Sequence, residues 1–136
     1  MTSICIMQKT QQVIYKVIIV FFFILMLLGG INHFTSPDFY NGLIPNFLNK
    51  NFVNYFSGVI ELMIAMLILF KRTRYYGLYL FVLLMILFMP IHIWDLLKEQ
   101  PAIGSKNIAL VRVFIQIIFI ISGYFVTKSL KRNNLI

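Results

Sequence analysis

Four apolar runs, each long enough to cross a lipid bilayer, constrain this chain more than any other feature of its sequence. They cover residues 14–31, 52–70, 75–94 and 108–126. A hydrocarbon core about 30 Å thick needs roughly 20 apolar residues per helix. Because the chain is 60% hydrophobic and only 12% charged, it has too little polar surface to enclose a soluble core. We therefore predict an all-α membrane protein, an antiparallel bundle of four transmembrane helices.

The segments between these runs are too short to fold separately. The longest is a first loop of about 20 residues, which is well below the size of an independent domain. The first run differs from a signal peptide, because it is long and no small-residue cleavage pattern follows LLGGINHF. The whole chain, residues 1–136, is therefore predicted to be a single transmembrane domain.

The basic residues predict how the bundle is oriented. Of the twelve Lys and Arg residues, eight fall at the helix ends that share a side with both termini. The other four are Lys50, Lys98, Lys106 and Arg112. Since cytoplasmic segments carry the excess of Lys and Arg, both termini are predicted to be cytoplasmic (N-in/C-in). The net charge of +8 then reflects topology and attraction to lipid headgroups, so we predict the lipid bilayer and no nucleic acid as a partner.

A single cysteine, Cys5, excludes two kinds of chemistry within one chain. Disulfide cycling needs a pair of cysteines, and a cysteine metal cluster needs several. We predict no metal site and no redox cofactor bound by this chain. Any electrons used by the protein would therefore come from a partner or from a soluble donor.

Polar side chains inside the apolar runs are the candidate functional residues. Glu61 lies nine residues after Phe52, roughly 14 Å along a helix, where a charged group costs at least about 3 kcal/mol. Glu61 is therefore expected to be protonated or to have a partner within the bundle. Asn54, Gly58 and Ala65 share its helix face, which predicts that this small and polar stripe contacts other helices.

The fourth run offers the candidate partner for Glu61. One helix face of this run carries the small and polar residues Ala109, Arg112, Gln116, Gly123 and Thr127. We predict that Arg112 pairs with Glu61, either directly or through Gln116. This pairing would place all three side chains in the outer half of the bundle.

Two histidines lie at the outer ends of the first and third runs. Side chains lean toward the N-terminus of their own helix, so His33 and His92 tilt inward, toward the level of Arg112. Pro90 removes a backbone hydrogen bond close to His92. The predicted polar cluster, or ligand site, is therefore His33, Glu61, His92, Arg112 and Gln116. Trp94, Tyr40 and Tyr55 are interpreted as aromatic anchors at the outer surface.

A series of short motifs covers nearly the whole chain in a fixed order. They are GGINHFTSPDFYNGLIP, YFSGVIELMIAMLILF, a basic turn, FMPIHIWD and LVRVFIQ. Together they resemble the DoxX-like family of small four-helix bacterial membrane proteins. The resemblance implies a multi-pass protein of the bacterial cytoplasmic (inner) membrane. Relatives have been linked to the membrane subunit of a thiosulfate:quinone oxidoreductase, to methylamine utilisation and to oxidative-stress complexes. The resemblance thus implies a quinone as candidate ligand and an oxidoreductase subunit as candidate partner.

Three functions are compatible with these residues, and whether the chain is an enzyme stays open. The first is a membrane subunit of a quinone-linked oxidoreductase system that binds a lipophilic small molecule, with Glu61 as proton donor or acceptor. The second is a non-catalytic anchor or maturation subunit for a partner enzyme, in which the polar cluster only locks the fold. The third, a small transporter, is disfavoured because the inner halves of the helices are almost purely apolar.

Overall fold

A computed structural model of the chain describes residues 2–132 as four long helices and one short helix. The helices are α1 (Thr2–Thr35), α2 (Asp38–Asn41), α3 (Lys50–Leu69), α4 (Arg74–Leu97) and α5 (Lys106–Arg132). Residue 1 and residues 133–136, which belong to the predicted domain, lie outside the described residues. The four long helices are each long and apolar enough to cross a membrane. The predicted all-helical architecture with four apolar helices is therefore confirmed.

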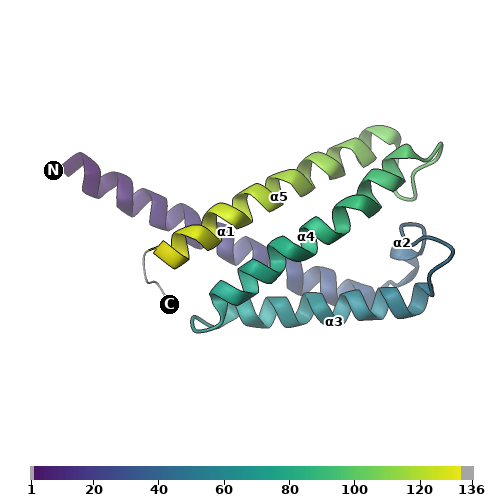
Figure 1. The fold of residues 1–136 in the computed structure, drawn as a ribbon, viewed down its shortest axis with the longest axis horizontal. Helices are drawn as coiled ribbons and strands as arrows, with labels where there is room; N and C mark the ends of the chain where they lie inside the picture. Colours follow the sequence, from purple (N-terminus) through teal and green to yellow (C-terminus); the bar gives the residue numbers. More distant parts are fainter. Residues whose placement is uncertain (1, 133–136) are drawn as a thin grey trace.

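The four long helices form two pairs (Figure 1). α1 packs along α3, α4 packs along α5, and a contact between α3 and α4 joins the pairs, whereas α1 and α5 touch little. The connections 36–49 and 98–105 lie at one end of the molecule, which we call the loop end. The 70–73 connection, the start of α1 and the end of α5 lie toward the other end, which we call the turn end.

The helices begin and end at residues with a clear local cause. α1 continues beyond the predicted end at residue 31 and stops at Thr35, because Pro37 disfavours helical geometry in the residue before it. The short α2 then forms inside the loop, where no helix was predicted. α3 begins after Asn49, whose side chain accepts a hydrogen bond from the Phe52 backbone N–H at 3.1 Å.

The connection between α3 and α4 satisfies the last carbonyl groups of α3 with side chains. The Thr73 hydroxyl donates to the Leu67 carbonyl oxygen at 2.9 Å. The Arg74 guanidinium donates to the carbonyl oxygens of Ile68 and Leu69 at 3.0 and 3.1 Å. Since the last turn of a helix leaves four carbonyl groups unpaired, these bonds permit a very short connection.

The core and the outward faces are both apolar. Phe22 and Phe81 stack at 4.2 Å between ring centroids in the middle of the bundle. Large apolar side chains also remain exposed on all four long helices, for example Val17, Met63, Leu87 and Ile118. An outer surface of this kind matches the hydrocarbon of a bilayer better than water.

Candidate functional site

Three glycines bring α1 and α3 close together next to the site. A Cβ atom at Gly58 would lie 2.7 Å from the Cβ of His33, and one at Gly30 would lie 3.1 Å from the Gly58 carbonyl oxygen. A Cβ atom at Gly29 would collide with the carboxylate of Glu61. Small residues at a helix contact allow such close backbone approach. They let His33 on α1 reach the polar stripe of α3.

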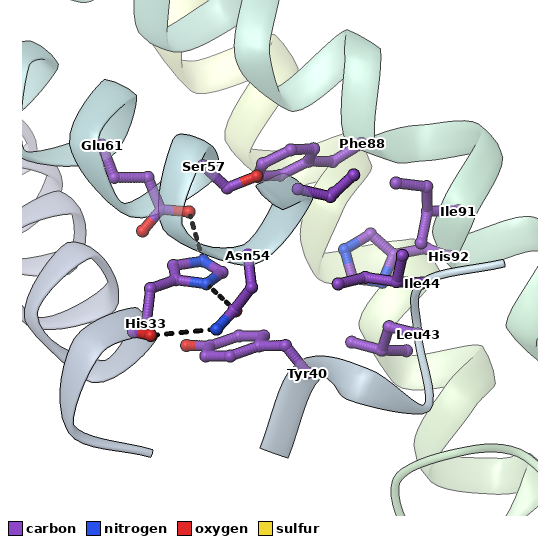
Figure 2. Close-up of a pocket in the computed structure, with 11 residues that line it drawn as sticks. His33, Tyr40, Leu43, Ile44, Asn54, Ser57, Glu61, Phe88, Ile91 and His92 are labelled. Carbon is purple, nitrogen blue, oxygen red and sulfur yellow. Dashed lines mark hydrogen bonds and ion pairs between the residues drawn. The ribbon is translucent and has the colours of Figure 1, made fainter. Parts of the chain in front are cut away.

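His33 contacts two polar side chains of α3, as Figure 2 shows. The Asn54 side-chain N–H donates to the His33 carbonyl oxygen at 3.0 Å, so the Asn54 Oδ1 atom accepts from His33 Nδ1 at 2.6 Å. This arrangement places a proton on Nδ1 and leaves Nε2 facing Glu61 Oε1 at 3.4 Å. Only 5% of His33 and 6% of Glu61 is exposed. The two groups are thus placed to exchange a proton out of contact with water.

The first loop supplies a further side chain to this group. The Tyr40 ring stacks on the His33 imidazole, with 3.8 Å between centroids and 19° between planes. Its hydroxyl accepts a hydrogen bond from the Asn32 side chain at 3.0 Å. Burial raises the pKa of Tyr40 above its usual range, which keeps the phenol protonated. The structure therefore places Tyr40 in the site and not among surface anchors, because α2 folds the loop back over the bundle.

These side chains line one wall of a cavity of about 190 Å³ at the loop end (Figure 2). The facing side is mostly apolar and is formed by Leu43, Ile44, Phe88, Ile91 and His92. The His92 Nδ1 atom is buried and has no hydrogen-bond partner among residues 2–132. A buried polar atom of this kind costs free energy unless a further group pairs with it. The cavity therefore combines apolar walls with polar groups on two sides.

Arg112 does not line this cavity, and its predicted pairing with Glu61 is wrong. The Arg112 Nη2 atom lies 2.6 Å from Asp95 Oδ2 on α4. The other oxygen of Asp95 accepts from the Ala102 backbone N–H at 2.8 Å and from Lys98 Nζ at 3.1 Å. Asp95 is 0% exposed. The cause is the depth of each residue below the loop end. Asp95 lies in the last turn of α4, beside the first turns of α5, whereas Glu61 lies about 16 Å into α3.

Gln116 also points elsewhere than predicted. Its side-chain N–H donates to the Met85 carbonyl oxygen at 2.8 Å, which joins α5 to α4. Of the five residues predicted as one cluster, the structure thus brings His33, Glu61 and His92 to one cavity. Arg112 and Gln116 hold the second helix pair together instead.

Several residues of the site were not predicted from the sequence. Asn54 was recognised only as part of a buried stripe, although it lies seven residues before Glu61 and so shares its helix face. Ser57, which also lines the cavity, carries no distinctive sequence signal. Asp95 follows His92 by three residues, and this acid at the end of an apolar run was the available signal for a partner of Arg112.

The fold and the site together define a class of protein: four helices of membrane-spanning length that enclose a small cavity near one end. Residues 22–127 match a family model described as a domain of unknown function (DUF8561), and the chain belongs to this family. The match contains every residue that lines the cavity. No curated protein and no solved structure matches the chain.

Proposed function

We propose that the protein spans a bacterial cytoplasmic membrane as an antiparallel four-helix bundle with both termini in the cytoplasm. The length and hydropathy of the four helices and their exposed apolar side chains support insertion into the bilayer. Eight of the twelve basic residues belong to the turn end, and all four acidic residues lie elsewhere. The positive-inside rule therefore supports a cytoplasmic turn end. In this orientation the cavity at the loop end lies in the outer half of the bundle.

In this bundle the cavity binds the ring of a lipophilic small molecule of the quinone class. One observation carries the proposal: a mostly apolar cavity has the imidazole of His92 in one wall and the Glu61 and His33 pair in the other. Its volume of about 190 Å³ is suited to one substituted ring, since an apolar cavity of about 150 Å³ is known to hold benzene. Apolar walls with a few oriented polar groups are typical of small-molecule sites.

The polar groups have distinct roles in this proposal. The imidazole of His92 forms a hydrogen bond to one carbonyl oxygen of the ring through the ring nitrogen that faces the cavity. Glu61 and His33 face the ligand from the other wall and exchange a proton with it. Asn54 holds the His33 ring in the required tautomer. Reduction of a quinone takes two electrons and two protons, and the electrons come from a partner oxidoreductase subunit. The resemblance to DoxX-like proteins supports the choice of a quinone.

Native mass spectrometry of the gently solubilised protein tests this function. Wild type is compared with His92→Leu, which removes the hydrogen-bonding nitrogen, and with Trp94→Leu, an exposed neighbour at the same end of α4. We expect a quinone-like mass on wild type and on Trp94→Leu, and its loss from His92→Leu. A reproducible protein partner with no retained small molecule on wild type would contradict the proposal and support the anchoring function.

A further inference from the structure

A second and larger cavity lies at the turn end, far from the site described above. Its volume is about 540 Å³, and it is formed by the start of α1, the connection between α3 and α4, and the end of α5. Four of its lining residues are cationic: Lys16, Lys71, Arg74 and Arg132. Glutamine, tyrosine and serine side chains complete the polar part of the lining. The cavity therefore gathers positive charge from three separate segments of the chain.

None of the residues that line this cavity is acidic. All four acidic residues of the chain are remote: Asp38, Asp95 and Glu99 belong to the loop end and Glu61 to the middle of α3. Arg74 donates to backbone carbonyl groups of α3. The other three cationic side chains have no ion pair within the described part of the chain. Like charges held close together repel, so an anion from outside the chain would stabilise this end.

The floor of the cavity has a different character from its rim. Ile19 of α1 and Leu130 of α5 line it and are buried, whereas Lys16, Lys71 and Arg132 are exposed. A ligand with an anionic group at the cationic rim and an apolar portion on the apolar floor would match both parts of the cavity. The turn end is also the level at which the helices reach the surface of a bilayer, where phospholipid headgroups lie.

We propose that this cavity binds the phosphate headgroup of an anionic membrane phospholipid. Lys71 and Arg132 bind the phosphate oxygens with Lys16, and the first part of the acyl chains covers Ile19 and Leu130. Basic pockets between transmembrane helices on the cytoplasmic side bind such headgroups in other proteins. α1 and α5 contact each other in the core through the rings of Phe21, Phe22 and Phe119, and the bound lipid adds a second link between them at the turn end.

A matched pair of double variants tests the site. Lys71→Gln with Arg132→Gln removes two lining cations, whereas Arg72→Gln with Lys131→Gln removes the same charges from adjacent positions that do not line the cavity. Native mass spectrometry measures retained phospholipid after incubation with phosphatidylglycerol or with phosphatidylcholine. We expect a preference for phosphatidylglycerol that falls about tenfold or more in the first variant and by less than about threefold in the second.

The outcomes distinguish a specific lipid site from general attraction of anionic lipid to a basic surface. An equal loss in both variants, or no preference for phosphatidylglycerol in wild type, would overturn the proposal in favour of general attraction to a basic surface. Inorganic phosphate, added at constant ionic strength, distinguishes the lipid from the free ion. The lipid adduct should persist in its presence, and replacement of the lipid by phosphate would overturn the assignment to a phospholipid. Circular dichroism verifies that both variants keep the helical fold. We expect both to fold, because all four substituted side chains are exposed.

Discussion

Replacing Asp95 with alanine should destabilise the protein more than replacing any other acidic residue. Its buried carboxylate accepts hydrogen bonds from Arg112, from Lys98 and from the Ala102 backbone N–H. Arg112 belongs to α5, whereas Lys98 and Ala102 belong to the 98–105 connection, so the Asp95 carboxylate joins α4 to both segments. Loss of the carboxylate would leave the Arg112 cation without its counter-charge and a backbone N–H without its acceptor.

The magnitude follows from burial. Removing one partner of a buried ion pair costs about 3–5 kcal/mol. Because the Arg112 side chain is 19% exposed and water can solvate part of its charge, we expect the lower end, about 3 kcal/mol, for Asp95→Ala. Arg112→Ala leaves Asp95 with two other donors, so we expect about 2 kcal/mol. If the double variant costs about 3 kcal/mol, the coupling energy is about 2 kcal/mol. Glu61 and Arg112 do not touch, so their coupling should stay within about 0.5 kcal/mol.

The assay is the free energy of unfolding in mixed lipid and detergent micelles titrated with sodium dodecyl sulfate. Wild type, both single variants and the double variant complete the cycle for each pair. Glu99→Ala is the control, since Glu99 is an exposed acid in the same loop, and it should change stability by less than about 0.5 kcal/mol. A negligible coupling between Asp95 and Arg112, or a larger one between Glu61 and Arg112, would refute the pairing of Arg112 on α5 with Asp95 on α4.

The remaining predictions concern the contact of α1 with α3 and the turn after α3. Asn54→Ala should cost about 2 kcal/mol in the same titration, because the ring N–H and the carbonyl of His33 both lose a buried partner; an unchanged stability would contradict those two bonds. Gly58→Ala should cost about 1–3 kcal/mol and lower the thermal midpoint, because its Cβ would lie 2.7 Å from the Cβ of His33. Ser57→Ala, at the neighbouring position, is its control. Gly77→Ala should cost at least as much as Gly58→Ala, because its Cβ would lie 2.7 Å from a backbone nitrogen of α3, which cannot rotate away; comparable midpoints for Gly77→Ala and wild type would disprove that contact.

The four long helices could be predicted because the length of each apolar run matches the thickness of a bilayer. Their ends could not be predicted, since polar residues continue a helix beyond the apolar run when no proline interrupts it. α1 thus begins at Thr2 and α5 continues to Arg132, both well beyond the predicted limits of 14 and 126.

The contact between His33 and Glu61 follows from helix geometry that is visible in the sequence. Side chains on α1 lean away from the loop end and side chains on α3 lean toward it, so the two residues converge. The predicted burial of the stripe around Glu61 is also confirmed, with Asn54, Gly58 and Ala65 all buried. Periodicity thus identified the buried faces of α3 and α5, the two helices for which a face was predicted.

The path of the loops was not predictable from periodicity. Residues 36–49 and 98–105 pack on each other, since Lys98 Nζ donates to the Gly42 carbonyl oxygen at 2.7 Å. A Cβ atom at Gly42 would lie 2.7 Å from the Cβ of Ala102. This packing brings Tyr40 onto His33 and the Ala102 backbone N–H onto Asp95. Arg112 was predicted to pair with the wrong acid because Asp95, at the end of α4, lies at its level, whereas Glu61 lies deeper in the bundle.

The central claim, that the cavity at the loop end binds the ring of a quinone, is tested most directly by filling it. Val53 lines the cavity, whereas Val59 lies on the same helix with 47% of its surface exposed. The dissociation constant for decylubiquinone is measured in lipid nanodiscs for wild type, Val53→Trp and Val59→Trp. We expect binding to weaken by about tenfold or more in Val53→Trp and to stay within about twofold of wild type in Val59→Trp. Equal affinity of the two variants, or no binding to wild type, would contradict the account.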